Sequence, residues 1–259
     1  MSGAALVRLL LTGLGLALLV ACQPETAPAA ALSAAGPDRP AWLPEHYVIS
    51  PRSGIEPRRD GETLVFAVAP GRCSDQRDTT GPADCATGMR RSVLSGGSIY
   101  RNGHQYLHTF EVFVPADFAA RAGRGRFSVA RWQGQGAGQR LYDLELDAQR
   151  GVTFRGQSCV PPSGFGQWQR VYVRLGWAQD ETGFIEVRCG DGAVQHARLV
   201  YVASEVATAR APSGAAAERF EFQLGLIQDG GRLPGPVEIK LRRIAERRLY
   251  VIFGLAGSG

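Results

Sequence analysis

The alternation of apolar and polar residues over Gln167–Cys189 constrains the fold of this chain more than any other feature. The stretch contains two runs, Arg170–Trp177 and Gly183–Cys189, which the polar turn Gln179–Thr182 joins. In both runs apolar residues, most of them β-branched, recur at every second position, which is the period of a β-strand. The sequence therefore predicts a β-hairpin with one face in a hydrophobic core and the other face in water.

Similar runs recur along the rest of the chain, and Gly, Pro and Asp separate most of them. The further predicted strands are His46–Ser50, Glu62–Ala69, Arg90–Leu94, Tyr106–Pro115, Arg126–Gln133, Arg140–Asp147, Val152–Gln157, Ala197–Ala203, Glu218–Gln228, Val237–Ile244 and Arg247–Phe253. Helical periodicity is limited to one turn at Ala116–Ala122, and Ala207–Ala217 is predicted to be an exposed loop. Short strands with frequent turns predict an all-β sandwich or jelly roll.

The N-terminal sequence predicts export. Arg8 precedes an apolar run, Leu9–Val20, which is too short to cross a bilayer and is typical of a signal peptide. The ending Leu-Val-Ala-Cys resembles the lipobox of bacterial lipoproteins, which implies cleavage before Cys22 and acylation of that cysteine. The alternative is an ordinary signal peptide with a chance cysteine. Gln23 stands where the lipoprotein sorting rule looks for Asp, so the resemblance implies the outer membrane, facing the periplasm or the cell surface.

These features divide the chain into three parts. Residues 1–21 form the predicted signal peptide, and residues 22–40 combine the lipidated cysteine with a flexible tether rich in Ala and Pro. Residues 41–259 are predicted to form one folded domain. We expect this domain to be a monomer that a lipid anchor at Cys22 holds at a membrane.

Four further cysteines imply disulfides in an exported chain, although four cysteines allow three pairings. We favour Cys73 with Cys85, which closes a short loop, and Cys159 with Cys189, which ties the loop before the hairpin to its end. The spacings lack the close pairs that zinc prefers. No cofactor is expected, and a structural calcium ion is left open.

The positive charge of the chain is almost all arginine. The formal net charge is +5, and Lys240 is the only lysine. Guanidinium groups bind carboxylate and sulfate in a bidentate manner, so an arginine-rich surface suits an acidic polysaccharide. The alternative is a GC-rich genome, which raises Arg, Ala, Gly and Pro together. The sequence has no glycine-rich phosphate loop, and no nucleic-acid partner is expected.

Three segments and the hairpin follow one another in an order that resembles a known family. They are Tyr106–Phe118 (YLHTFEVFVPADF), Phe127–Gly134 (FSVARWQG) and, after the hairpin, Phe220–Asp229 (FEFQLGLIQD). The order resembles the bacterial polysaccharide lyases that include heparin lyase I and glucuronan lyase, whose jelly-roll plan alginate lyases share. The resemblance implies a concanavalin-like β-jelly-roll sandwich of two antiparallel sheets, and β-elimination on a uronic acid-containing polysaccharide.

The motifs of this family are matched only in part. An arginine two residues before a glutamate matches Arg91, but the glutamate is absent, and Gln-x-His falls on Arg131-Trp132-Gln133 without its histidine. Tyr-Phe-Lys-x-Gly-x-Tyr falls on 221–227, where Phe222 and Gly225 match and the tyrosines and the lysine are replaced. The resemblance implies substrate binding by Arg91, Arg131, Gln133 and Gln223.

Other residues could take over the proton transfer. His104, Tyr106 and His108 alternate on one predicted strand, so all three should share one face, and we predict that they are catalytic beside Arg91 and Arg131. The alternative is that they are partly buried packing residues.

A carboxylate stripe on another strand could also carry chemistry, and it comprises Asp143, Glu145 and Asp147. It partly matches the Glu-x-Asp-x-x-Glu motif of jelly-roll glycoside hydrolases, but Arg150 stands at the third acid. We favour a solvated strand face for it.

The sequence is compatible with three classes of function. The first is a lipid-anchored, lyase-like protein that cleaves an acidic polysaccharide by β-elimination. The alternative is a carbohydrate-binding envelope lipoprotein that kept the fold and lost the catalytic residues. A purely structural envelope protein is the third class.

Overall fold

The computed structural model describes residues 41–76, 82–96, 100–134, 139–210, 217 and 219–249. The predicted signal peptide, Cys22 and the tether lie outside the described residues, as do residues 211 to 216 of the predicted loop Ala207–Ala217. The prediction that this loop is exposed is wrong at its described ends, because Ala209 and Ala217 are buried.

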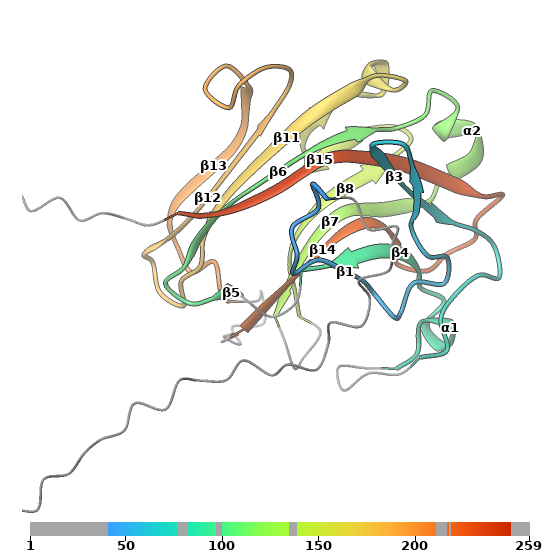
Figure 1. Cartoon of the computed structure of the whole chain (residues 1–259), viewed down its shortest axis with the longest axis horizontal. Helices are drawn as coiled ribbons and strands as arrows, with labels where there is room; N and C mark the ends of the chain where they lie inside the picture. The colour runs from blue at the N-terminus through green and yellow to red at the C-terminus, as the bar shows by residue number, and fades with distance from the viewer. Residues whose placement is uncertain are drawn as a thin grey trace, which may run out of the picture. The chain divides into compact units, whose positions relative to one another are not determined.

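Two antiparallel sheets make up this part of the chain (Figure 1). The first sheet has eight strands, in the order β1 (Val48–Ile49), β4 (Arg90–Ser95), β14 (Arg219–Gln228), β7 (Arg126–Gly134), β8 (Gln139–Asp147), β9 (Gly151–Phe154) and β10 (Gln157–Val160), with β5 (Tyr100–Arg101) also paired to β14. The second sheet has seven strands, in the order β13 (Arg198–Val206), β12 (Gly183–Cys189), β11 (Trp168–Gly176), β6 (Gln105–Phe113), β15 (Val237–Leu249), β3 (Thr63–Val68) and β2 (Arg58–Asp60).

The chain passes repeatedly from one sheet to the other, which confirms the predicted β-jelly-roll sandwich. Strand β14, for example, lies between β4 and β7 in the first sheet, whereas β13 before it and β15 after it belong to the second. The described helices are short: α1 (Asp84–Thr87), α2 (Phe118–Ala122) and the 3₁₀ turn Pro162–Gly164. Among the described residues, no helix is long and apolar enough to cross a membrane.

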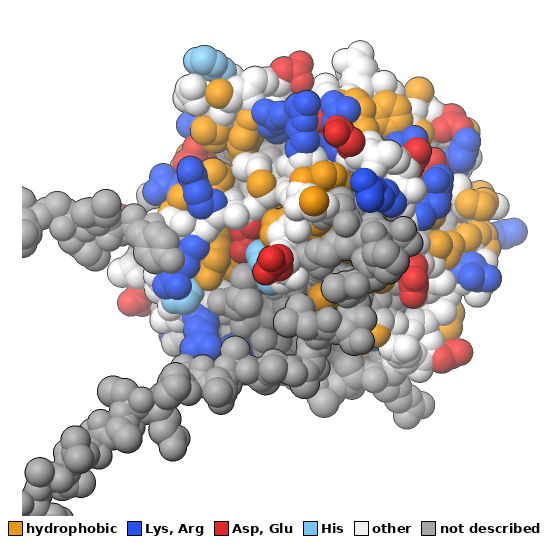
Figure 2. All heavy atoms as spheres, viewed as in Figure 1, with side chains coloured by type: hydrophobic (Ala, Val, Ile, Leu, Met, Phe, Trp, Pro, Cys, Tyr) orange, Lys and Arg blue, Asp and Glu red, His pale blue; other side chains and the backbone are white. Residues whose placement is uncertain are grey.

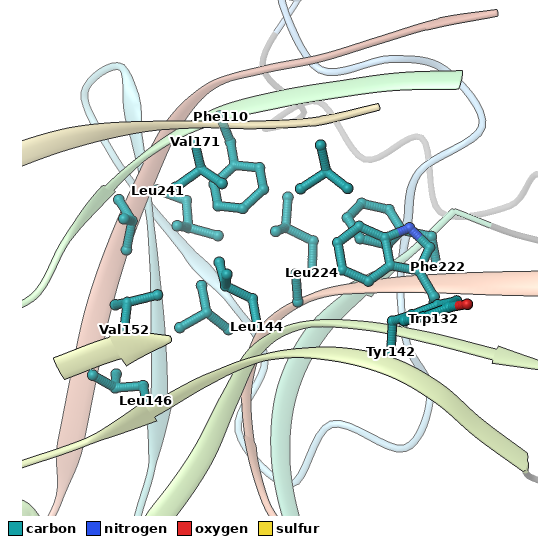
Figure 3. Close-up of a cluster of buried hydrophobic side chains, with 14 of the residues drawn as sticks. Phe110, Trp132, Tyr142, Leu144, Leu146, Val152, Val171, Phe222, Leu224 and Leu241 are labelled. Carbon is teal, nitrogen blue, oxygen red and sulfur yellow. The ribbon is translucent and has the colours of Figure 1, made fainter. Parts of the chain in front are cut away.

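Hydrophobic side chains from both sheets fill the layer between them (Figure 3). Phe110 and Val171 enter from the seven-stranded sheet, and Trp132, Leu144 and Phe222 enter from the eight-stranded sheet. The rings of Trp132 and Phe222 stack with their centroids 4.8 Å apart. A fully buried side chain of this size contributes about 1.5–3 kcal/mol. This layer is the core that the alternation of the strands predicts.

The predicted hairpin is confirmed as β11 and β12, which pair from Val171 with Cys189 to Gly176 with Phe184. The prediction of one strand over Val152–Gln157 is wrong. Arg155 and Gly156 have φ of 50° and 78°, so they form a tight turn between β9 and β10. The separate strands predicted before and after Ala245 are instead one long strand, β15.

Both favoured disulfide pairings are confirmed. Cys73 and Cys85 have their Cα atoms 5.1 Å apart, and Cys159 and Cys189 have theirs 5.4 Å apart. The second bond joins β10 of the eight-stranded sheet to β12 of the seven-stranded sheet. It therefore closes one edge of the sandwich covalently, which restricts the unfolded chain.

We expect Gly225→Ala to destabilise the fold by about 3 kcal/mol, because a methyl group at this position has no room. Its Cβ would lie 2.3 Å from the Ser92 carbonyl oxygen and 2.6 Å from Cδ1 of Phe66, and the φ of 147° favours glycine. Urea unfolding followed by circular dichroism measures the loss.

Gly103→Ala is the matched control. This exposed glycine also has a positive φ, 80°, but nothing lies within 4 Å of its Cβ position. Backbone strain alone should cost it about 1 kcal/mol. Equal losses in the two variants would contradict the steric explanation.

Candidate functional site

The outer face of the eight-stranded sheet brings together the four residues that the sequence analysis assigned to substrate binding. Residues that are directly paired across antiparallel strands point to the same side of a sheet. Gln223 on β14 is paired with Arg131 on β7 and with Ser95 on β4. With the alternation along each strand, this register gives the outer face Arg91, Ser95, Arg131, Gln133, Asp143, Glu221 and Gln223.

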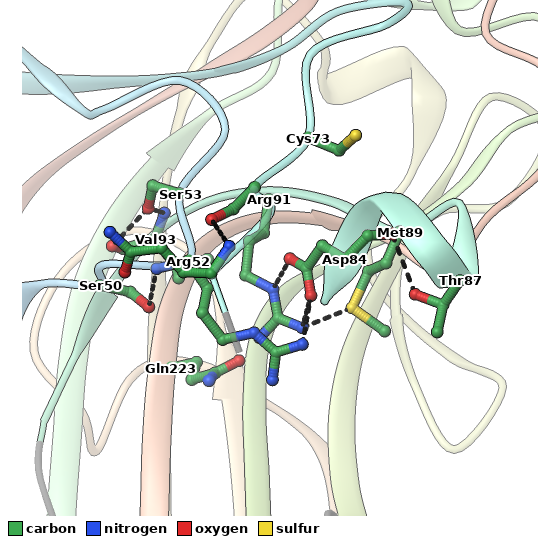
Figure 4. A network of polar contacts seen from close by, with 12 residues as sticks. Ser50, Arg52, Ser53, Cys73, Asp84, Thr87, Met89, Arg91, Val93 and Gln223 are labelled. Carbon is green, nitrogen blue, oxygen red and sulfur yellow. Dashed lines mark hydrogen bonds and ion pairs between the residues drawn. The ribbon is translucent and has the colours of Figure 1, made fainter. Parts of the chain in front are cut away.

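Arg91 lies at one side of this face and is bound to a buried carboxylate (Figure 4). Its Nε and Nη2 donate to Asp84 Oδ2 and Oδ1 at 2.5 and 2.8 Å, and Arg52 Nη2 donates to Asp84 Oδ1 at 2.6 Å. Burial lowers the pKa of Arg91, although Asp84 opposes this effect. Asp84 is the first residue of α1, and the disulfide between Cys85 and Cys73 fixes this helix. The disulfide-closed loop therefore positions the Asp84 carboxylate beside Arg91.

Glu221 occupies the middle of the face as the acceptor of three hydrogen bonds. Ser95 Oγ and Gln223 Nε2 donate to its Oε1 at 2.7 and 3.0 Å, and Gln133 Nε2 donates to its Oε2 at 2.8 Å. Both predicted sugar-binding glutamines therefore turn their amide nitrogens toward one carboxylate. The Oε1 atom of Gln223 is buried and has no hydrogen-bond partner within the described residues.

Arg131 lies at the other side of the face, where it binds two carboxylates. It donates to Asp143 Oδ1 at 3.2 Å and to Asp229 Oδ2 at 2.6 Å, and to the hydroxyl of Ser128 at 3.1 Å. Burial opposes the charge of Arg131, but Asp143 and Asp229 outweigh it and raise the pKa of the guanidinium. Burial raises the pKa of Asp143 despite its arginine neighbours.

These contacts correct the expectation that Arg91 and Arg131 are open carboxylate binders. Each residue is only 5% exposed, and each guanidinium is already paired with carboxylates of the chain. Asp143 shares the outer face as predicted, but it is buried and ion-paired, so the stripe is not simply a solvated strand face.

The predicted catalytic stripe of His104, Tyr106 and His108 lies elsewhere, and this expectation needs correction. The three side chains do line up, since His104 Nδ1 is 3.0 Å from the Tyr106 hydroxyl and the rings of Tyr106 and His108 stack at 6.2 Å. However, β6 belongs to the seven-stranded sheet, and Tyr106 and His108 are 4% and 1% exposed because they point into the core. They therefore do not meet Arg91 and Arg131 on one face.

Glu246 forms a buried polar centre beside this stripe, which the sequence analysis did not predict. Tyr47 donates to its Oε2 at 2.9 Å, Tyr100 also donates to Oε2, and His46 Nε2 lies at 3.3 Å. His108 Nδ1 lies 3.5 Å from the same oxygen. Burial alone would raise the pKa of Glu246, but its histidine and tyrosine neighbours outweigh this effect and hold it well below its usual range.

A hollow of about 580 Å³ lies where β7 begins and where β8 and β14 end. Its lining includes five arginines and three acids: Arg124, Arg126, Arg140, Arg150, Arg232, Glu145, Asp147 and Asp229. The sequence contains one signal for this site that was not among the predictions, the run Arg-Ala-Gly-Arg-Gly-Arg at 121–126. Asp229 also binds Arg131, so the hollow adjoins the outer face.

Several other arginines are paired with acids of the chain. On the outer side of the seven-stranded sheet, Glu111 accepts hydrogen bonds from Arg170, Arg242 and Arg243. Over the face drawn in Figure 2, Lys and Arg side chains lie among Asp and Glu and do not form one basic block. The arginine content alone therefore does not define a binding surface.

The described strands of the eight-stranded sheet offer no histidine, lysine or outward-facing tyrosine for proton transfer, and the carboxylates of their outer face are engaged in hydrogen bonds and ion pairs. Within the described ranges, no His or Lys lies on its strands, and its two tyrosines, Tyr100 and Tyr142, are core residues. The described residues also contain no group of three or more His, Cys, Asp or Glu that could hold a metal ion. The face can form hydrogen bonds and ion pairs, but it lacks the usual base for removing a proton from a sugar carbon.

Comparison with known proteins finds similarity in the backbone only. No family model and no curated protein sequence matches the chain. Similar solved structures include the endo-β-1,4-glucuronan lyase of the fungus Trichoderma reesei, at 15% identity and a TM-score of 0.49 over 77% of this chain and 86% of that one. The alginate lyase of Klebsiella pneumoniae has 12% identity and a TM-score of 0.47 over 76% and 86%. Alginate lyase A1-II′, of polysaccharide lyase family 7, has 13% identity and a TM-score of 0.48 over 74% and 82%.

We expect Glu246→Gln to lower the free energy of unfolding by about 2 kcal/mol at pH 7, because the charged acceptor of the buried network is lost. The folded protein holds the pKa of Glu246 below that of the unfolded chain, near 4.3. This stabilisation is therefore present above about pH 4.3 and is lost as the pH falls further. Urea unfolding between pH 7 and pH 3 should show the two proteins converging at low pH.

Glu238→Gln is the control on the same strand, since the Glu238 side chain is 32% exposed and lies 3.8 Å from Arg58. This substitution should change stability by less than about 0.5 kcal/mol. An equal pH profile for both variants would contradict the role given to Glu246.

Proposed function

We propose that this chain is a polysaccharide lyase-like protein that binds an acidic, uronic acid-containing polysaccharide on the outer face of the eight-stranded sheet without cleaving it. The observation that carries the proposal is the composition of that face. Gln133, Glu221 and Gln223 offer amide and carboxylate groups that suit sugar hydroxyls, and the adjoining hollow adds arginines for acidic groups.

β-Elimination requires a group that neutralises the uronate carboxylate and a base that removes the neighbouring proton. Arg91 and Arg131 are already neutralised by acids of the chain, so neither guanidinium is left to neutralise a uronate carboxylate for the reaction. Tyr106 and His108 lie in the core on β6 of the other sheet, and His104 lies directly before that strand. These contacts favour the non-catalytic alternative over the lyase reaction.

The purified chain should release no unsaturated sugar from alginate, glucuronan or heparin, measured by ultraviolet absorbance, and alginate in an affinity gel should retard it. Gln133→Ala should weaken this retardation about fivefold, because one hydrogen bond of the half-buried amide is worth about 1 kcal/mol. Release of unsaturated product would overturn the non-catalytic proposal, and a chain that binds none of the polymers would overturn the binding itself.

Gln195→Ala is the matched control for the gel. This exposed glutamine lies on the loop between β12 and β13, in the seven-stranded sheet. Its loss should leave the retardation unchanged. If both glutamine variants bind equally, the outer face of the eight-stranded sheet is not the binding surface.

The proposal includes a lipid anchor at Cys22 in the outer membrane, facing the periplasm or the cell surface. It is supported by the lipobox-like Leu-Val-Ala-Cys and by Gln23. The chain should incorporate radioactive palmitate when expressed in a bacterium, and Cys22→Ser should abolish the label. Cys159→Ser is the control, because its thiol is engaged with Cys189. Label in the Cys22 variant would rule out the anchor.

A further inference from the structure

The hollow at the ends of β7, β8 and β14 contains charge that the chain itself does not balance. Its acids are already engaged: Asp229 with Arg140 at 2.9 Å, and Asp147 with Arg150 at 2.7 Å. Glu145 lies 3.4 Å from Arg140 and 3.6 Å from Arg150. Five arginines against three acids leave the lining with two more positive than negative charges.

The unbalanced charge comes from Arg124, Arg126 and Arg232. All three are exposed, and within the described residues none of them has a carboxylate or hydrogen-bond partner. They reach the hollow from two separate segments, the start of β7 with the connection before it and the loop after β14. Like charges gathered in one hollow repel one another unless an anion joins them.

A second observation points to the same ligand chemistry. Gln228 lines the hollow and is fully buried, and Arg90 Nη1 donates to its Oε1 at 3.0 Å. This bond identifies the other amide atom as the nitrogen, and that Nε2 has no acceptor within the described residues. An unpaired buried donor is costly, so an acceptor from a ligand would stabilise it.

The wall formed by Gly230 and Gly231 leaves space for such a ligand. Both residues have a positive φ, 84° and 85°, which glycine adopts without strain. They place backbone in the lining of the hollow and no side chain. The hollow has the volume of a small-molecule site.

We propose that this hollow binds a phosphate monoester. At neutral pH this group carries a charge near −2 and several acceptor oxygens, so it balances both excess charges and can join guanidinium groups from two segments. A uronate carboxylate or a sulfate ester carries only −1 and leaves one charge unbalanced. The inference deepens the proposed function, because it names phosphate as a second ligand chemistry beside the uronate. It rests on the proposed function only where the phosphate is attached to a glycan.

Three sugars that differ at one carbon test the inference by titration calorimetry with the intact purified protein. Glucose 6-phosphate should bind at least about tenfold more tightly than glucose 6-sulfate and glucuronate. The combined Arg124→Ser, Arg126→Ser and Arg232→Ser variant should lose about tenfold or more of the affinity for glucose 6-phosphate. Arg72→Ser is the control, because this exposed arginine does not line the hollow, and it should bind as the parent does.

Equal binding of the three sugars, or unchanged binding by the triple variant with an intact circular dichroism spectrum, would overturn the inference. Retardation by alginate tests the proposed function separately. If the chain binds alginate but does not prefer glucose 6-phosphate, the proposed function stands and this inference fails. A glucan phosphorylated at C6 and vesicles that contain phosphatidate then distinguish a glycan carrier from a lipid carrier, and parental binding of both by the triple variant would again count against the site.

Discussion

The burial of one face of each sheet against the other organises this protein. Every second side chain of a strand enters the layer between the sheets, where residues such as Phe110, Trp132 and Phe222 pack together. Their neighbours along the strands must then point outward, which places Arg131, Gln133 and Gln223 on one surface. One local irregularity interrupts this alternation of inward and outward side chains. A register shift in β15, at Arg243 with a φ of 50°, turns Glu246 inward among tyrosines and histidines.

The arginines discussed above have two different roles, according to whether an acid of the chain binds them. Arg91 and Arg131 are buried and bound to acids, and removing one partner of such a buried pair would leave an uncompensated charge. They are therefore best understood as parts of the fold. Arg124, Arg126 and Arg232 are exposed without partners within the described residues, so their charge is available to a ligand.

The arrangement of the strands does not by itself decide the function of this chain. A jelly roll can carry many activities, and the activity depends on the side chains at the site. Here the outer face of the eight-stranded sheet holds hydrogen-bonding groups around Glu221, and the candidate proton-transfer residues lie on the other sheet. This separation is the reason why we propose that the face binds a polysaccharide without cleaving it.

The sequence by itself determined the all-β class, most of the strands and the hairpin β11–β12, because the alternation of a strand is a local signal. It favoured the two disulfide pairings that the structure shows, but four cysteines allow three pairings, and only the structure decided among them. It missed the β9–β10 turn, where Arg155 adopts a positive φ that few non-glycine residues adopt. Only the tertiary structure decided the site. The alternation placed His104, Tyr106 and His108 on one face correctly, but it could not say that this face is the core. Likewise, Asp84 and Asp229 reach Arg91 and Arg131 from other segments, so the neutralisation of these arginines depends on contacts that no local pattern contains.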